Sequence, residues 1–185
     1  DSNKWFGTES VVDSLACQCC RTALYADSSG LISVVYRDIL PGSIRDISLA
    51  TSRDGGATFS NSISFSFDQW NLEGCPHNGP DVVSNGKKIF TTWYTGASQN
   101  GIYFAELDTQ GKTLSKEKLS PNGRNIQLSL IYGKPVVVYS ESVTENGKKG
   151  SRIIRMDMTS GEKTQLSAPG SKVSNPVSLA MKSGM

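Results

Sequence analysis

The apolar positions fall in short runs separated by turn residues, a pattern typical of β-strands. Six runs of about five to seven residues are rich in β-branched and aromatic side chains and are bounded by Gly, Asn, Asp or Ser. They span residues 31–36, 44–50, 88–94, 101–106, 134–139 and 152–158. No apolar stripe with helical spacing persists for three turns. The sequence therefore predicts an all-β fold.

The predicted strands also repeat along the chain. Three stretches begin with one strand, pass through a turn and continue in a second strand, and their starts are followed by a fourth at Pro176. The starts at Asp81, Asn125 and Pro176 lie 44 and 51 residues apart. A four-stranded unit that repeats at about 40–50 residues is typical of a β-propeller blade. We expect residues 1–185 to form one propeller domain, with units at about 21–70, 79–120 and 124–168 and a partial unit at 174–185.

One turn carries a more specific pattern. Ser52, Asp54, Gly56, Thr58 and Phe59 have the Ser-x-Asp-x-Gly-x-Thr-Phe spacing called an Asp box. The Asp carboxylate can accept hydrogen bonds from turn amides, the Gly tolerates a positive φ, and the Phe can fill the space between strands. We expect this turn to connect the last two strands of the first unit and to have a structural role.

From about Arg21 to its end, the chain resembles the sialidase-like Asp-box (BNR-repeat) propellers. More narrowly, it resembles bacterial sialidase-related proteins with a Cys-x-Cys-Cys-Arg motif, here 17–21, and a Cys-Pro-His-x-Gly-Pro motif, here 75–80. The resemblance implies a propeller of four-stranded antiparallel blades, about three to four of them in this chain. It also implies that a sialidase site would have an arginine cluster, a Tyr–Glu nucleophile pair and an acidic proton shuttle.

Candidates for such a site are present, but their context differs from that of sialidases. The arginine candidates are Arg21, Arg37, Arg45 and Arg124, and the nucleophile candidates are Tyr94 or Tyr139 with Glu141. The Arg-Ile-Pro motif that precedes the first Asp box in sialidases is missing. Arg37 and Arg45 are each followed by Asp, which suggests local ion pairs. We expect no sialidase turnover, and a sialidase-like glycoside hydrolase or glycan-binding module is the alternative function.

The four cysteines and the only histidine lie in two clusters. Cys17, Cys19 and Cys20 precede the first unit, and Cys75 and His77 precede the second. Because the innermost strands of neighbouring blades start near the axis on one face, both clusters should meet there. Thiols and an imidazole are soft ligands that suit Cu(I) or Zn(II) better than Mg²⁺ or Ca²⁺. The sequence therefore predicts a soft-metal site, with Cu(I) first and Zn(II) second.

The same cysteines allow two other interpretations. In an oxidising compartment, Cys17 or Cys19 bridged to Cys75 is the most favourable disulfide, because a bond between Cys19 and Cys20 would be strained. Redox-active thiols are the remaining possibility. If a metal binds, three or four sulfurs leave little open coordination, which favours storage, delivery or a structural role over catalysis.

Composition narrows the partners. The chain has 19 Lys and Arg against 17 Asp and Glu, which argues against a nucleic-acid-binding surface. No apolar run approaches the roughly 20 residues of a membrane helix. A start without Met suggests a processed periplasmic, secreted or cell-surface protein.

We expect self-association or a further chain to complete the propeller ring. The expected partner is a glycan or a protein that donates or accepts a metal ion. Arg21, Trp70 and Tyr94 are candidates for ligand contacts, with Trp70 as a lid over the cysteines.

Overall fold

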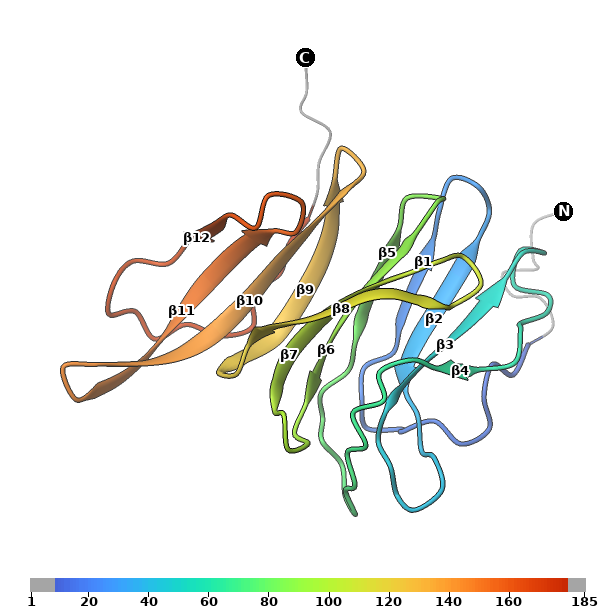
Figure 1. Ribbon diagram of the computed structural model, residues 1–185, viewed down its shortest axis with the longest axis horizontal. Helices are drawn as coiled ribbons and strands as arrows, with labels where there is room; N and C mark the ends of the chain where they lie inside the picture. Colours follow the sequence, from blue (N-terminus) through green and yellow to red (C-terminus); the bar gives the residue numbers. More distant parts are fainter. Residues whose placement is uncertain (1–8, 180–185) are drawn as a thin grey trace, which may run out of the picture.

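The computed structural model describes residues 9–179, which form three four-stranded antiparallel sheets (Figure 1). The first sheet has the order β1 (Ala23–Ala26), β2 (Ile32–Arg37), β3 (Ile47–Ser52) and β4 (Ile63–Ser64). The second has the order β5 (Asp81–Ser84), β6 (Ile89–Thr95), β7 (Gly101–Leu107) and β8 (Thr113–Ser120). The third has the order β9 (Gly123–Ile131), β10 (Lys134–Glu145), β11 (Lys148–Asp157) and β12 (Lys163–Gln165). No α-helix occurs within residues 9–179, so the all-β prediction is confirmed.

The sheets stand side by side with their first strands adjacent: β1 contacts β5, and β5 contacts β9 (Figure 1). One apolar core fills the space between the first two sheets and includes Leu49 and Trp93. A second core, which includes Phe104 and Val137, fills the space between the second and third sheets. Because the second sheet packs on both sides, β6 is buried on both of its faces. This accounts for the β-branched and aromatic residues that fill the whole strand, three buried threonines included.

The strand boundaries differ from the predicted ones where polar residues continue a ladder. In the third unit, the predicted run 134–139 ends at Tyr139 because the apolar residues end there. In the structure β10 and β11 remain paired out to Glu145 and Lys148 in a long polar hairpin. Backbone hydrogen bonds between antiparallel strands do not require apolar side chains. The pattern of apolar residues therefore underestimates the length of an exposed hairpin.

The predicted fourth unit does not begin with a strand in the part that the structure describes. Residues 171–179 form no strand, and the side chains of Val177 and Leu179 are 88% and 81% exposed. The segment nevertheless reaches β9, where the hydroxyls of Ser178 and Ser129 lie 2.8 Å apart. The remaining residues of this predicted unit, 180–185, lie outside the described residues.

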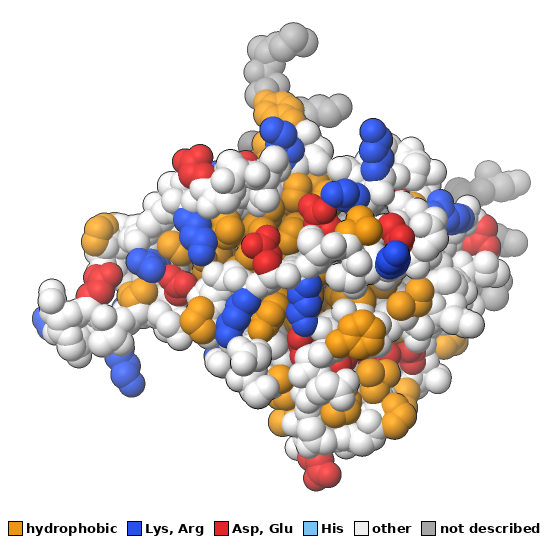
Figure 2. All heavy atoms as spheres, viewed as in Figure 1, with side chains coloured by type: hydrophobic (Ala, Val, Ile, Leu, Met, Phe, Trp, Pro, Cys, Tyr) orange, Lys and Arg blue, Asp and Glu red, His pale blue; other side chains and the backbone are white. Residues whose placement is uncertain are grey.

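The surface is mixed in charge. On the face shown in Figure 2, Lys and Arg side chains are interspersed with Asp and Glu. The ion pairs among residues 9–179 join Lys88 to Glu106, Lys116 to Asp68, and Arg152 to Glu141. The same residues include no helix long and apolar enough to cross a membrane.

A hydrogen-bonded turn connects β3 to β4. The Asp54 carboxylate accepts hydrogen bonds from the Thr58 hydroxyl at 2.6 Å and from the Thr58 N–H at 2.9 Å. The Ser52 hydroxyl accepts a third from the N–H of Gly56, whose φ of 90° is strained for other residues. The bonds from Thr58, with help from Ser52, lower the pKa of Asp54 to about 2.

We expect this carboxylate to stabilise the fold at neutral pH and to lose its effect in acid. Its pKa falls from 3.8 in the unfolded chain to about 2 when folded. The contribution is therefore complete above the unfolded pKa and disappears as the pH falls through the folded one. Asp54→Ala should lower Tm at about pH 7, and the difference from wild type should vanish near pH 2. Equal Tm values at neutral pH would contradict this expectation.

Candidate metal centre

A tight turn before β1 gathers three thiols. The Cys20 N–H donates to the Cys17 carbonyl at 3.2 Å, and the Cys17 N–H donates to the carbonyl of Arg37 at 2.8 Å. The Cys17 Sγ lies 3.5 Å from the Sγ atoms of both Cys19 and Cys20. The three sulfurs all lie within 4.8 Å of one another. The turn thus supplies the bend that Cys20 needs to join Cys17 and Cys19.

The spacing of these sulfurs fits a metal ion. A thiolate–metal bond of about 2.3 Å puts sulfurs about 3.8 Å apart in a tetrahedral site and about 4.0 Å apart in a trigonal one. The separations in the turn, from 3.5 Å to at most 4.8 Å, bracket both values. Cys17 and Cys20 are buried and Cys19 is half-buried, so a bound ion would be largely shielded from water.

The segment before β5 brings Cys75 to the same place. Figure 1 shows that the segments leading into β1 and β5 lie at the same end of the sheets, where these two strands begin. They touch at Gly79, where a Cβ atom would lie 1.9 Å from the Arg21 carbonyl oxygen. The Cys75 thiol faces Cys19, and their hydrogen-bonding interaction lowers the pKa of Cys19 and raises that of Cys75. Cys75 is exposed and does not belong to the group of three close sulfurs.

His77 approaches the cysteines through its backbone. A hydrogen bond from the backbone of this residue helps to lower the pKa of Cys19. The residue is exposed, and among residues 9–179 its ring is not in the group of ligand atoms that lie within 4.8 Å of one another. The structure therefore brings three of the five predicted ligands into one compact group, places Cys75 next to Cys19 at its exposed side, and leaves the imidazole outside the group.

Arg37 is a buried cation next to this group. Its guanidinium is fully buried and donates to three carbonyls, those of Arg45 at 2.5 Å, Tyr94 at 2.6 Å and Asn78 at 3.1 Å. None of the ion pairs found in residues 9–179 includes it. Burial lowers the pKa of Arg37, and the nearby Cys20 sulfur opposes that shift. The Asp68 carboxylate and the Cys17 sulfur act on the pKa of Arg37 in the same direction as Cys20. Because a buried charge is costly unless it is compensated, Arg37 favours negative charge on the sulfurs.

The local ion pairs expected for Arg37 and Arg45 are wrong. Asp38 instead accepts a hydrogen bond from the Ser48 hydroxyl at 2.7 Å. Asp46 accepts from the N–H groups of residues 69 and 70, at 3.1 and 3.2 Å. Neighbouring side chains in extended backbone point to opposite sides, so an Arg and the Asp that follows it do not meet.

Trp70 covers Arg37. The guanidinium carbon lies 4.8 Å from the centre of the Trp70 ring, and the ring meets Tyr94 edge-on at 5.7 Å. Two bonds to the Asp46 carboxylate hold the backbone of Gln69 and Trp70. The candidate lid thus contacts the cation beside Cys20, and Tyr94 supports it from the second sheet.

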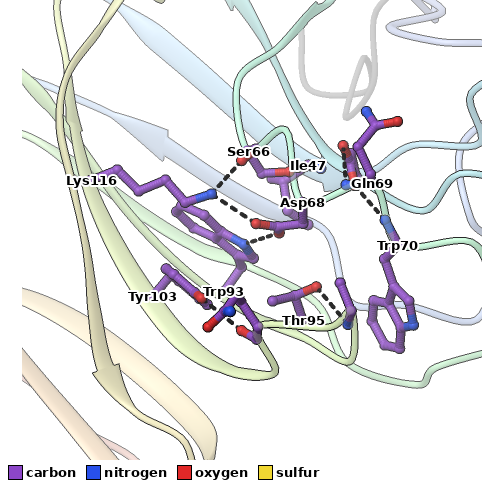
Figure 3. Close-up of polar contacts among 12 residues, drawn as sticks. Ile47, Ser66, Asp68, Gln69, Trp70, Trp93, Thr95, Tyr103 and Lys116 are labelled. Carbon is purple, nitrogen blue, oxygen red and sulfur yellow. Dashed lines mark hydrogen bonds and ion pairs between the residues drawn. The ribbon is translucent and has the colours of Figure 1, made fainter.

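A polar cluster that sequence reasoning missed anchors the segment carrying Trp70 (Figure 3). Asp68, with only 4% of its side chain exposed, accepts hydrogen bonds from Trp93 Nε1 at 2.6 Å and from Lys116 Nζ at 2.8 Å. The Lys116 ammonium also lies 4.9 Å from the centre of the Tyr103 ring. These residues come from distant parts of the chain and share no motif, so no sequence signal marks them.

Of the nucleophile candidates, Tyr139 and Glu141 lie in β10 of the third sheet and make other contacts, whereas Tyr94 lies in β6 of the second sheet. Tyr139 is 1% exposed within the second core, and burial raises its pKa to about 12. Glu141 accepts two hydrogen bonds from Arg152, at 2.7 and 2.9 Å, and one from Ser120 at 2.6 Å. Burial would raise the pKa of Glu141, but these bonds lower it. Neither side chain shares a partner with Arg37.

Two further arginines lie near the starts of β1 and β9, the first strands of the first and third sheets. Arg21 donates to the carbonyls of Pro80 and Ile126, each at 3.2 Å, and so joins all three sheets. Arg124 stacks on the ring of Tyr94, with 4.0 Å from its guanidinium carbon to the ring centre. The arginine candidates are thus spread over separate contacts.

The three sheets are those of a partial β-propeller. An ulvan lyase of polysaccharide lyase family 25, solved with a bound -[GlcA(1-4)Rha3S]- glycan, is similar over 83% of this chain and 44% of its own, at 14% identity and a TM-score of 0.50. A thermostable family-43 glycoside hydrolase is similar over 84% of this chain and 54% of its own, at 13% identity and a TM-score of 0.47. An α-L-arabinofuranosidase from Clostridium thermocellum is similar over 83% and 54%, at 15% identity and a TM-score of 0.47.

This chain spans about half the length of the structures that it matches. At such low identity the likeness shows the fold alone. No protein-family profile and no curated protein matches the sequence.

Proposed function

We propose that Cys17, Cys19 and Cys20 hold one soft cation, and that the chain serves in metal storage or delivery. The observation that carries this proposal is the group of three thiols packed within 4.8 Å beside the buried Arg37. Thiolates prefer soft ions, and the buried Arg37 cation offsets part of the negative charge that three thiolates would accumulate. Such a centre leaves little room for a substrate, which favours binding over catalysis.

Cu(I) suits this group better than Zn(II). Structural zinc sites are almost always four-coordinate. The compact group supplies three sulfurs, Cys75 lies at its exposed side, and the His77 ring is not part of it. A site with three sulfurs therefore matches Cu(I), which binds fewer thiolate ligands, better than it matches four-coordinate Zn(II).

The direct test is metal titration of the fully reduced chain under anaerobic conditions. We expect one Cu(I) per chain and the loss of three titratable thiols upon binding. Mass spectrometry of protein isolated without reductant provides the contrasting outcome. A quantitative bridge from Cys17 or Cys19 to Cys75, with no metal bound after reduction, would replace the metal centre by a structural disulfide.

Cu(I) affinity should decrease as the pH falls. Burial raises the pKa of Cys20 to about 12, so this thiol holds its proton at neutral pH. A metal ion must displace that proton, and affinity then falls about tenfold per pH unit for each proton released. Competition with a chromophoric chelator between about pH 6 and 8 measures the slope. An affinity independent of pH would show that Cys20 is not a ligand.

A second candidate function is a glycan-binding module or a sialidase-like hydrolase. A hollow of about 260 Å³ lies among the starts of β1, β5 and β9 and is lined by Arg21, His77, Asn125 and Gln127, among others. Polar groups in a hollow at this end of a propeller could bind a sugar. We expect no release of sialic acid from a fluorogenic sialoside. Release that is abolished by Arg21→Ala would favour this second function.

A further inference from the structure

A hollow of about 200 Å³ opens beside the three-cysteine turn. Its wall is formed by residues 14–18 of the turn, Ile39, Arg45, Gly74 and Cys75. Cys17 and Cys75 both line it, although the first is buried and the second exposed. The hollow therefore lies between the solvent-facing Cys75 and the buried Cys17 of the turn.

The four thiols form a series from outside to inside. Cys75 is exposed, Cys19 is half-buried, and Cys17 and Cys20 are buried. Cys75 faces Cys19, and Cys19 lies 3.5 Å from Cys17 through their sulfurs. Each thiol is thus adjacent to the next one inward, which is the arrangement that stepwise ligand exchange requires.

Arg45 adds a positive charge to the wall of the hollow. Its Nε donates to the Leu72 carbonyl at 3.1 Å, which fixes the side chain. No ion pair found in residues 9–179 includes Arg45, and the adjacent Asp46 is engaged by backbone N–H groups. A guanidinium with free donors recognises a carboxylate through paired hydrogen bonds.

We propose that this hollow is the uptake site of the metal centre, and that it receives Cu(I) as a complex with a small anionic thiol compound. This inference rests on the proposed metal-binding function. Arg45 binds a carboxylate of the carrier, and Cys75 is the first protein ligand. The ion then passes to Cys19 and on to Cys17 and Cys20.

The exchange balances without a redox step. In each transfer from the carrier, one bond between Cu(I) and a carrier thiolate breaks and one bond between Cu(I) and a protein thiolate forms. The proton of the protein thiol passes to the departing carrier thiolate. Copper stays Cu(I), and no disulfide forms.

Transfer kinetics with two carriers test the site. Cu(I) is supplied to the reduced chain either as its glutathione complex, which carries carboxylates, or as its 2-mercaptoethanol complex, which carries none. We expect Arg45→Gln to slow transfer from glutathione about tenfold and to leave transfer from 2-mercaptoethanol unchanged. Arg45→Lys keeps the charge but not the paired hydrogen bonds, so it should restore only part of the rate. Arg53→Gln, an equal charge change at the exposed β3–β4 turn, is the matched control and should have no effect.

Cys75→Ser separates uptake from holding. It should slow transfer from both carriers about tenfold, with the equilibrium affinity for Cu(I) changed less than about threefold. Unchanged rates in Arg45→Gln and Cys75→Ser, with affinity intact, would overturn the uptake site and leave the metal centre standing. Equal slowing of both carriers by Arg45→Gln would overturn the anionic carrier. A wild-type chain that binds no Cu(I) would instead overturn the proposed function itself.

Discussion

Cys20→Ser should weaken Cu(I) binding on the order of 100-fold. Zinc-finger sites with four ligands bind with apparent free energies of about 10–16 kcal/mol, or roughly 3 kcal/mol per ligand, and about 1.4 kcal/mol corresponds to tenfold in affinity. Cys20 is buried, lies 3.5 Å from Cys17 through their sulfurs, and is next to the Arg37 guanidinium. A serine hydroxyl there is a hard, neutral donor that neither binds Cu(I) well nor balances the buried cation.

Competition with a chromophoric Cu(I) chelator measures this loss. Cys75→Ser is the internal control because it makes the same replacement of sulfur by oxygen at an exposed position outside the group of three sulfurs. Its effect on affinity should be less than about threefold. If both variants lost affinity equally, the centre would have four equivalent ligands, and the preference for Cu(I) argued from three sulfurs would fail.

The second large effect is on stability: Trp93→Ala should lower the free energy of unfolding by about 3–5 kcal/mol. Trp93 is fully buried between Phe65, which it meets at 85° with 5.6 Å between ring centres, and Tyr103, which it stacks on at 18° and 5.6 Å. Its Nε1 also donates to the Asp68 carboxylate at 2.6 Å. The alanine variant would leave a cavity between two sheets and a buried carboxylate with one donor fewer.

Urea unfolding followed by circular dichroism provides the measurement, provided that the transition is two-state. Trp93→Phe is the matched variant, since it keeps most of the apolar volume and removes the N–H. We expect it to cost less than half as much as the alanine variant. A loss below about 1 kcal/mol for Trp93→Ala would mean that the first two sheets do not share one core.

A series of contacts connects Trp93 in the core to the three-cysteine group. Asp68 belongs to the segment that carries Trp70, and Trp70 packs on Arg37 beside Cys20. Trp93 and Lys116 of the second sheet hold Asp68 through hydrogen bonds. Through Asp68 they therefore position Trp70 on the buried guanidinium of Arg37. The interface between blades and the surroundings of the thiols are parts of one packed region.

Much of this molecule follows from local patterns along the chain. Runs of β-branched and aromatic residues predicted the two middle strands of each sheet, because a strand that is buried on one or both faces needs those side chains at fixed spacing. The turn at residues 52–59 could be predicted because its hydrogen bonds join groups only a few residues apart. The close spacing of Cys17, Cys19 and Cys20 likewise pointed to a shared site, since one tight turn suffices to bring their sulfurs together.

The surroundings of the thiols depended on contacts between distant segments. Arg37 looked like the partner of the next residue, yet it enters the protein interior and donates to carbonyls of residues 45, 78 and 94. Cys75 and His77 are two residues apart, yet Cys75 meets Cys19 through its thiol and His77 meets it through its backbone. How this segment lies against the cysteine turn is set by the packing of one blade's lead-in against the next, as at Gly79 and Arg21. A linear pattern does not contain that information, because it arises when sheets that are far apart in the chain exclude water from a common interface.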